Sequence, residues 1–221
     1  MIETKIGLGV FRVKNVRFLT RHSFIVRTGR NHIHFTPGQR VKINMPGEKV
    51  SRRYSIYSSM DVPYLEFLIR EVDDGYLTPR LKPLMPGDEL EIFGPNGHFT
   101  LKDIDVNTSK LLFVSTGTGI APFHSIILST PGLNYQLVHG VRFSDEAYDR
   151  HHYEKNRLTV CTSREVGKDF NGRVTDFLKT IDPRNFDHLF LCGNRQMIDD
   201  VIYWAEVNGF SKEQIHTEVY F

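Results

Sequence analysis

Cysteine is scarce in this sequence: Cys161 and Cys192 are the only two in 221 residues. Two cysteines do not make the disulfide framework of a small secreted protein, so a reducing cytoplasm is the expected compartment. They are also too few to hold an iron–sulfur cluster, which usually takes about four thiolates.

Long apolar runs and metal-binding patterns are also missing. No run approaches the roughly 20 residues that span a bilayer, and residues 1–5 lack the apolar region of a signal peptide. The pairs His32/His34 and His151/His152 have no third ligand at a useful spacing, and no nucleophile set of the Ser/His/Asp or Cys/His kind stands out. We therefore expect neither a membrane span nor a metal.

Acidic residues are nearly absent from residues 1–60, which hold twelve Lys and Arg against two acids, a net +10. The remainder holds sixteen against twenty-four, a net −8, so that the total is +2. This asymmetry predicts an anionic ligand or partner for the first part of the chain. Nucleic acid is not expected, because the basic residues are spread over strand-like segments and no nucleic-acid motif accompanies them.

The first half contains short strand-like segments separated by Pro/Gly turns, a pattern typical of a small antiparallel barrel. These segments are residues 9–16, 22–28, 40–45, 52–58, 64–72 and 89–93. One short helix interrupts them at residues 75–81, where Thr78 is predicted to be the N-cap and Pro79 the first helical residue. Such a helix start can bind an anion, although a capped helix without a ligand is the alternative.

In the second half, strand-like and helix-like segments alternate, which predicts a parallel sheet with helices on both faces. They are residues 110–115, 123–128, 136–141, 145–156, 158–162, 174–180, 188–192, 195–208 and 215–220. Asn194 is placed to cap the helix that follows it, and Gly209 to end that helix.

The segment Arg52-Arg53-Tyr54-Ser55 combines a cation, a flat ring and a hydroxyl on a predicted strand. A strand turns Arg52 and Tyr54 to one face and Ser55 to the other. That group suits a ligand with a phosphate and a planar heterocycle. The alternative is an ordinary amphipathic strand with exposed arginines.

Thr116-Gly117-Thr118-Gly119 follows a predicted strand and precedes a helix, the context in which a glycine-rich turn binds a pyrophosphate. Pro122 stands where a full dinucleotide fingerprint has a third glycine, so a simple tight turn is the alternative. Two arginines after further predicted strands, and a third a few residues beyond the second, suit a 2′-phosphate, or are simply surface residues. These are Arg142, Arg164 (after Ser163) and Arg173.

Taken together, these motifs resemble the ferredoxin/flavodoxin–NADP(+) reductase family of the plant-type superfamily, and its bacterial members in particular. The resemblance implies two domains. Residues 1–102 would be an FAD-binding, six-stranded antiparallel Greek-key β-barrel, and residues 103–221 an NADP-binding α/β domain with a parallel sheet.

The resemblance also implies roles for single residues. Ser55, Cys192 and Glu218 would take part in catalysis beside the flavin N5 and the nicotinamide. FAD would be bound by Arg52, Arg53, Tyr54, Ser55, Ile69, Gly75, Leu77, Thr78, Tyr220 and Phe221. NADP would be bound by Thr116, Gly117, Thr118, Gly119, Arg142, Ser163, Arg164, Arg173, Cys192 and Gly193. Phe221 lies one residue beyond the family's terminal Glu-x-Tyr pattern, which leaves open the ring that stacks on the flavin.

The implied activity is hydride transfer between NADPH and flavin, followed by single-electron exchange with a carrier. The carrier would be an acidic ferredoxin or flavodoxin on a separate chain, and the reductase a cytoplasmic monomer. Three alternatives stay open: an NAD(P)H:flavin reductase, the reductase component of an oxygenase, and a non-catalytic nucleotide-binding module on the same fold. FAD is expected rather than FMN.

Overall fold

The structure is a computed structural model that describes residues 7–220. The chain separates into two compact units, one made of residues up to Thr100 together with Ala121–Ser129, the other of Leu101–Ile120 and the residues from Thr130 onward. Helix α2 (Ala121–Ser129) therefore packs with the first unit, although it follows the first strand of the second. The domain boundary after residue 102 stays a prediction. Within residues 7–220, no helix is long and apolar enough to cross a membrane.

The first unit is a six-stranded antiparallel sheet, curved into a barrel, in the order β4-β3-β6-β1-β2-β5. This non-sequential order confirms the predicted Greek-key barrel. Its strands are β1 (Gly7–Phe18), β2 (Ser23–Gly29), β3 (Arg40–Asn44), β4 (Arg52–Ser55), β5 (Tyr64–Arg70) and β6 (Glu89–Asn96).

Strand β1 gives the sheet its curvature because it pairs with two partners. Its first half pairs with β6, and its second half pairs with β2, with a register shift between Val13 and Asn15 in the β1–β2 pairing. Such an irregularity bends a strand and increases its twist. The side chains turned inward, among them Phe24, Phe67 and Ile92, form one buried core.

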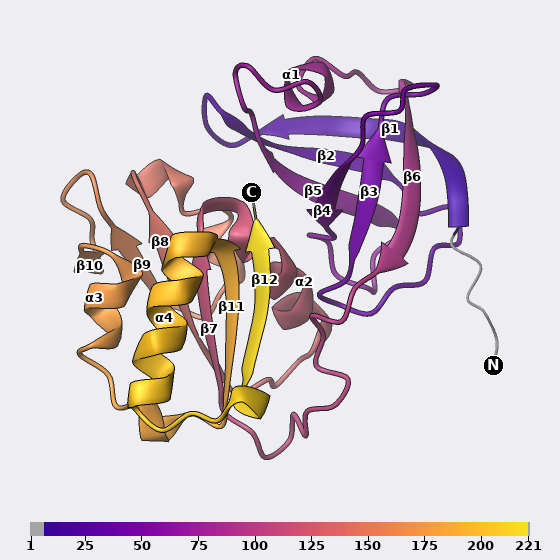
Figure 1. Ribbon diagram of the computed structural model, residues 1–221. Helices are drawn as coiled ribbons and strands as arrows, with labels where there is room; N and C mark the ends of the chain where they lie inside the picture. Colours follow the sequence, from indigo (N-terminus) through magenta and orange to yellow (C-terminus); the bar gives the residue numbers. More distant parts are fainter. Residues whose placement is uncertain (1–6, 221) are drawn as a thin grey trace. The chain divides into compact units, whose positions relative to one another are not determined.

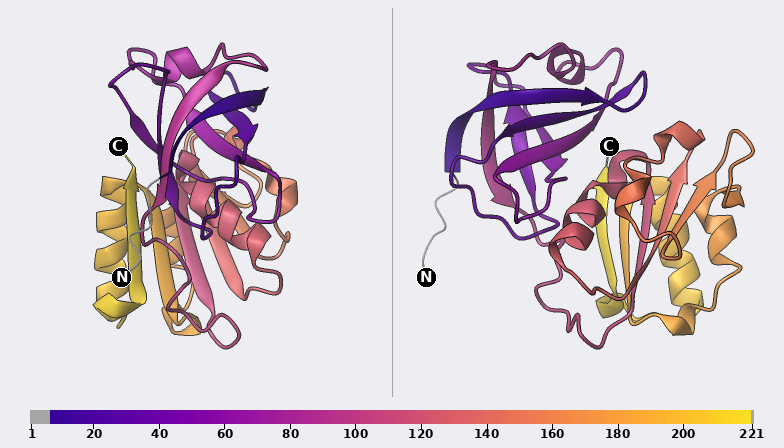
Figure 2. Two further views of the ribbon diagram at one scale, coloured as in Figure 1. Left: turned by 90° about the vertical axis from the view of Figure 1, so that its right-hand side faces the viewer. Right: turned by 180° about the vertical axis from the view of Figure 1, so that it is seen from behind.

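The short helix α1 (Thr78–Leu81) lies across one end of the barrel (Figures 1 and 2). The prediction that Thr78 caps it is wrong: Leu77 is the N-cap, and no side chain caps the helix. The Thr78 hydroxyl instead accepts the Val72 backbone N–H at 2.9 Å and closes the preceding loop. A Cβ on Gly75 would lie 2.8 Å from the Val72 carbonyl oxygen, so the closed loop requires glycine there.

The second unit is a six-stranded, fully parallel sheet in the order β10-β9-β8-β7-β11-β12. The prediction of a parallel α/β unit is confirmed. The strands are β7 (Leu111–Thr116), β8 (Tyr135–Val141), β9 (Leu158–Thr162), β10 (Phe170–Asn171), β11 (His188–Asn194) and β12 (Ile215–Tyr220). The two-residue strand β10 is not among the predicted segments. The predicted segment 145–156 forms only the 3-10 turns η2 (Ser144–Glu146) and η3 (Arg150–His152).

Helices α3 (Val174–Leu178) and α4 (Arg195–Val207) cover one face of this sheet, as Figure 1 shows. Their apolar side chains join alternate strand residues, such as Val114, Val138 and Leu191, in one buried core. The intervening strand residues face the other way. Among them, Phe113 packs edge-on against Phe190, with 5.7 Å between the ring centroids.

Candidate functional site

The order of the parallel strands reverses at β7, since β8 pairs on one side of it and β11 on the other. Open α/β sheets bind ligands at such a switch point, beyond the carboxyl ends of the strands. Here hydrogen bonds join the carboxyl ends of β7 and β11. Thr116 Oγ1, at the end of β7, accepts the backbone N–H of Asn194, at the end of β11, at 3.2 Å and the Asn194 Nδ2–H at 3.1 Å. The Asn194 side chain in turn caps α4 by accepting the Met197 N–H, which confirms the predicted cap.

Two glycines allow this close approach. A Cβ on Gly119 would lie 2.3 Å from the Cys192 carbonyl oxygen, and a Cβ on Gly193 would lie 2.2 Å from Thr116 Oγ1. Gly117 has φ +53°, so the turn starts in the left-handed region. This conformation turns successive backbone N–H groups toward one side, the arrangement that binds phosphate oxygens. The sequence-predicted residues Thr116 to Gly119 and Cys192 to Gly193 thus come together.

A buried row of polar side chains lies just before these strand ends. Strand register places His139 beside Ser115, Ser115 beside Cys192, and Cys192 beside Glu218. All four residues are less than 10% exposed. The predicted neighbours Cys192 and Glu218 are therefore adjacent on β11 and β12, and the row extends two strands further than the sequence indicated. Ser115 Oγ has no hydrogen-bond partner among residues 7–220.

His139 contacts the Thr116–Gly119 turn directly, with Nε2 2.9 Å from the Gly117 carbonyl oxygen. Burial lowers its pKa from 6.5 to about 4, while the hydrogen bond to Gly117 and the charge of Glu146 act weakly in the opposite direction. The ring is therefore neutral at pH 7. Because a carbonyl can only accept, Nε2 carries the proton.

The arginines predicted to bind a 2′-phosphate follow the carboxyl ends of three neighbouring strands. Arg142 follows β8, Arg164 follows β9, and Arg173 follows β10 and precedes α3. The Arg164 backbone N–H donates to the Arg142 carbonyl at 3.0 Å, which holds two of these segments side by side. Neither of those two guanidinium groups forms an ion pair or hydrogen bond within residues 7–220, and both side chains are exposed. Ser163 is exposed as well, and its hydroxyl donates to the Val141 carbonyl.

In the first unit, β4 arranges its residues as the sequence predicts. Arg52 and Tyr54 lie opposite Ile43 and Val41 of β3, on the core-facing side. Tyr54 packs against the barrel core, and its pKa is raised because burial outweighs the nearby positive charge of Arg52. Tyr54 therefore stays a neutral phenol.

The side chains of the other predicted flavin residues differ in direction and in burial. Arg53 lies opposite Lys42 and so turns away from Arg52, while Ser55 is buried. The side chains of Ile69 and Leu77 belong to the barrel core, so only their backbone groups are available to a ligand. Tyr220 ends β12 in the second unit, and Phe221 lies outside the described residues.

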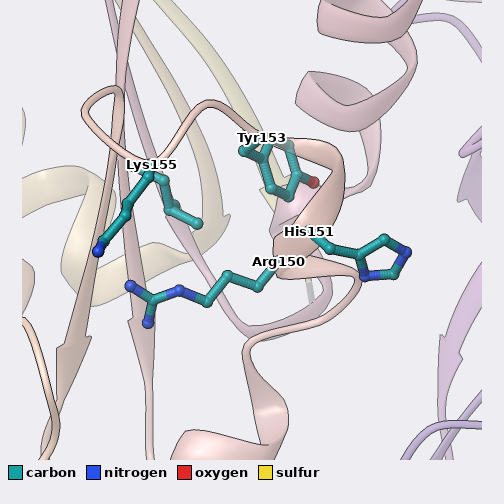
Figure 3. A pocket seen from close by; sticks show the side chains of 5 residues that line it. Arg150, His151, Tyr153 and Lys155 are labelled. Carbon is teal, nitrogen blue, oxygen red and sulfur yellow. The ribbon is translucent and has the colours of Figure 1, made fainter.

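A separate hollow of about 440 Å³ is lined by Arg150, His151, Tyr153, Lys155 and Leu158. Arg150 and Lys155 extend to one side and His151 to the other (Figure 3). Arg150 is already paired with Asp169, with 2.7 Å between nitrogen and oxygen. Leu158 begins β9, so this hollow lies at the opposite end of that strand from Arg164. We assign no ligand to it.

Sequence reasoning missed His139, because it looked for metal ligands and nucleophiles among the histidines. Its position in an apolar strand, directly before Gly140, is a signal of burial. A buried histidine needs a hydrogen-bond partner, and the adjacent glycine-rich turn supplies one. Ser115 gave no signal beyond its place before the turn.

Residues 14–101 match the Oxidoreductase FAD-binding domain family, and residues 113–202 match the Oxidoreductase NAD-binding domain family. The chain is similar to the flavodoxin/ferredoxin–NADP reductase of Escherichia coli strain K12, with 34% identity over 190 residues, which cover 75% of this chain and 77% of that protein. It is also similar to the toluate 1,2-dioxygenase electron transfer component of Pseudomonas putida, with 26% identity over 93% of this chain and 66% of that protein.

Among solved structures, a ferredoxin NADP+ reductase from Neisseria gonorrhoeae with bound FAD and NADP has the same fold. The TM-score is 0.87, the sequence identity is 22%, and the match covers 97% of this chain and 99% of that one. At this identity the likeness concerns the fold alone.

Proposed function

The chain belongs to the ferredoxin/flavodoxin–NADP reductase family, and we propose that it is an FAD-dependent oxidoreductase that exchanges a hydride with NADP(H) and single electrons with a carrier protein. The observation that carries this proposal is the joined turns at the ends of β7 and β11, where Gly119 and Gly193 allow an approach that a Cβ would prevent. Unpaired guanidinium groups lie at the ends of the neighbouring strands. This donor set fits a dinucleotide with an additional phosphate.

On the flavin side, Arg52 is the cation for the flavin phosphate and Tyr54 the ring that packs on the heterocycle. The exposed guanidinium of Arg52 bonds only its neighbour, the Ser51 carbonyl, within residues 7–220. The oxygen of the Thr78 hydroxyl already accepts the Val72 N–H, so its O–H or the backbone N–H groups of α1 would donate to the phosphate. The assignments of Arg53, Ile69, Gly75 and Tyr220 to flavin stay predictions.

On the nucleotide side, the backbone N–H groups of Thr118 and Gly119 bind the pyrophosphate, while Arg142, Arg164 and Arg173 bind the 2′-phosphate. A dianion needs several cations, and an arginine binds it through two parallel hydrogen bonds. Asp176 accepts the Arg173 backbone N–H at 3.3 Å and partly offsets the charge of that arginine. We therefore give Arg164 the larger share of the specificity for NADP(H).

When bound, the flavin would supply the redox chemistry, because it can accept a hydride, which carries two electrons, and pass electrons on one at a time. The chain's own residues position the reactants and manage charge. Cys192 would lie beside the nicotinamide as a small, buried side chain and not as a nucleophile. Glu218 lies beside Cys192 in strand register and is buried, so its carboxyl group can form a hydrogen bond there. The Ser55 hydroxyl would supply a hydrogen bond near the flavin N5.

The carrier protein that we propose is an acidic ferredoxin or flavodoxin. The net +10 of residues 1–60 supports this, because complementary charge accelerates encounter between two proteins. We expect the reductase to act as a monomer in the cytoplasm. Electron transfer to the carrier should slow strongly between about 0.01 M and 0.5 M salt, as the Debye length shortens. A rate without salt dependence would remove the charge argument.

A second candidate, the reductase component of an oxygenase, is favoured by the similarity to the toluate dioxygenase component. Both functions share the reduction of flavin by a nicotinamide nucleotide, and they differ in the acceptor. Purified ferredoxin and flavodoxin, offered as acceptors beside an oxygenase component, separate the two.

The experiment that tests the proposed function is an anaerobic titration of the purified protein with NADPH, and separately with NADH, followed from about 350 to 700 nm, where bound flavin absorbs. NADPH should bleach a bound-flavin spectrum far more efficiently than NADH. Equal efficiency would refute the roles of Arg164 and Arg173. A protein that holds no flavin and cannot be reconstituted with FAD would refute the proposed function itself.

A further inference from the structure

The contact between His139 and Gly117 joins strand β8 to the Thr116–Gly119 turn that follows β7. The two residues are 22 positions apart in sequence, and the Nε2–oxygen distance is 2.9 Å. His139 is 1% exposed, so water does not compete for this bond. The Gly117 carbonyl is thus held by a buried side-chain donor from outside η1 (Gly117–Ile120), the 3-10 turn to which Gly117 belongs.

Holding this carbonyl also orients the next N–H group. In a trans peptide, the carbonyl of one residue and the N–H of the following residue point in opposite directions. The Gly117 oxygen points to His139, so the Thr118 N–H points away from it. Thr118 is only partly buried. Gly117 has φ +53°, and a Cβ added to it would meet nothing within 4 Å, so no side-chain packing holds this peptide in place.

The surroundings of His139 extend the same restraint to the neighbouring strand end. Glu146, 7% exposed, lies close enough to act electrostatically on the imidazole. Its carboxylate also accepts the Arg142 backbone N–H at 2.9 Å. Glu146 therefore supports the backbone of Arg142, and His139 supports the Thr116–Gly119 turn. Both side chains are buried and lie close to each other.

We propose that His139 is a positioning residue of the nucleotide site: it holds the Gly117 peptide so that the Thr118 N–H is directed at the pyrophosphate of NADP(H) before the nucleotide binds. This inference rests on the proposed function. It assigns the role to the neutral Nε2–H donor, not to a charge. A side chain of similar size without a donor at that place leaves the Gly117 peptide free to rotate, and the nucleotide then binds less tightly.

The test compares His139→Leu, His139→Asn and His139→Gln in the full-length flavoprotein. Leucine removes the donor, and asparagine places its amide too near the backbone to reach Gly117. The Gln Nε2 reaches about as far as the imidazole Nε2 and restores the donor. For the Leu and Asn variants we expect the Kd for NADP+, measured by calorimetry, and the KM for NADPH to rise about five- to tenfold, which corresponds to the net value of one hydrogen bond. The Gln variant should stay within about twofold of the parent protein.

A merely structural role would give a different result. In that case flavin content and kcat would fall together with thermal stability, and glutamine would not restore binding. Our proposal instead predicts an unchanged flavin spectrum and a kcat at saturating NADPH within about twofold of the parent. His216→Leu is the matched control. His216 is partly buried in the same unit and stacks on Phe190, with 4.1 Å between ring centroids, but it lies near the start of β12.

The outcomes are distinct. His139→Leu with the NADP+ affinity of the parent would overturn the inference, as would a glutamine variant as weak as the leucine variant. If His139→Leu does not fold, His139→Asn carries the same comparison. If the parent protein neither binds NADP+ nor is reduced by NADPH, the proposed function fails instead.

Discussion

The imidazole of His124 lies parallel to the ring of Tyr57, with the centroids 3.7 Å apart and the planes at 2°. His124 Nδ1 is 2.7 Å from the Tyr57 carbonyl oxygen, so Nδ1 is the donor. The next residue, Ser125, donates from Oγ to the Ser58 carbonyl at 2.8 Å. Helix α2 thus completes the backbone hydrogen bonding of the residues that directly follow the Arg52–Ser55 strand.

Replacing His124 with leucine should lower the free energy of unfolding by about 2–3 kcal/mol. The variant loses the ring stack and leaves the buried Tyr57 carbonyl without its donor. Urea unfolding followed by circular dichroism measures the change. His98→Leu is the control, because His98 is an exposed histidine in the same unit. Equal unfolding midpoints for the two variants would contradict the importance of the His124–Tyr57 contact.

Two buried serines offer a matched pair of alanine substitutions. Ser115 and Ser125 are both 0% exposed, but only Ser125 has a hydrogen-bond partner for its hydroxyl within residues 7–220. Ser125→Ala should cost about 1–2 kcal/mol, because it removes the donor to the Ser58 carbonyl. Ser115→Ala should be neutral or stabilising by up to about 1 kcal/mol, because it removes a buried hydroxyl that is not paired. Urea unfolding curves of the two variants and the parent measure these changes. A large loss of stability in Ser115→Ala would reveal a hydrogen-bond partner for this hydroxyl.

Gly119→Ala should weaken NADP+ binding by about tenfold or more while the flavin is retained. The new Cβ would lie 2.3 Å from the Cys192 carbonyl oxygen, so the turns after β7 and β11 must move apart, at a typical cost of 1–3 kcal/mol. Gly132→Ala is the control: its φ is +79°, and nothing lies within 4 Å of the added Cβ. It should lose about 1 kcal/mol of stability and bind NADP+ normally. Unchanged NADP+ affinity in Gly119→Ala would show that the turns adapt.

The sequence predicts much of this fold because its signals are local. Alternating strands with Pro/Gly turns indicate the barrel, and β4 turns Arg52 and Tyr54 to the face that strand geometry requires. The β7 turn, with Gly117 and Gly119, is recognised from its context between a strand and a helix. The bounds of the longer strands differ from the predicted ones by only a few residues.

The contacts that sequence reasoning missed join residues far apart in the chain. His139 and Gly117 are separated by 22 residues, and His124 and Tyr57 by 67. No periodicity or spacing reveals which buried histidine meets which carbonyl, because the pairing depends on strand order and helix packing. Thr78 fails for a related reason. Its hydroxyl has two competing partners, a helix end and the Val72 N–H, and the folded loop selects the second.

Arg164→Ala should raise the KM for NADPH about 10- to 100-fold and leave the KM for NADH nearly unchanged. The lost interaction is a charge-assisted bond to the 2′-phosphate, worth about 1.5–3 kcal/mol, and NADH lacks that group. Arg184→Ala is the control, since Arg184 is an exposed arginine of the same unit paired with Asp182. Steady-state kinetics with both nucleotides measures the ratio. A parallel rise for NADPH and NADH would place Arg164 on a part of the nucleotide that the two share.

Acid should destabilise this protein partly through His139. Burial lowers the pKa of His139 to about 4 from the usual 6.5, so between these values the unfolded chain binds a proton that the folded chain does not. The free energy of unfolding therefore falls as the pH drops through 6.5 and levels off below about 4. The total loss is about 3 kcal/mol, which corresponds to the difference between a pKa of 6.5 in the unfolded chain and about 4 in the folded chain. Burial lowers the pKa of His216 as well, which adds to the loss in the same direction. Urea unfolding at pH 7.5 and at pH 5 should show a smaller pH effect in His139→Leu than in the parent. An equal pH effect in both proteins would mean that the imidazole is protonated in the folded state, and the neutral-donor role of His139 would then be wrong.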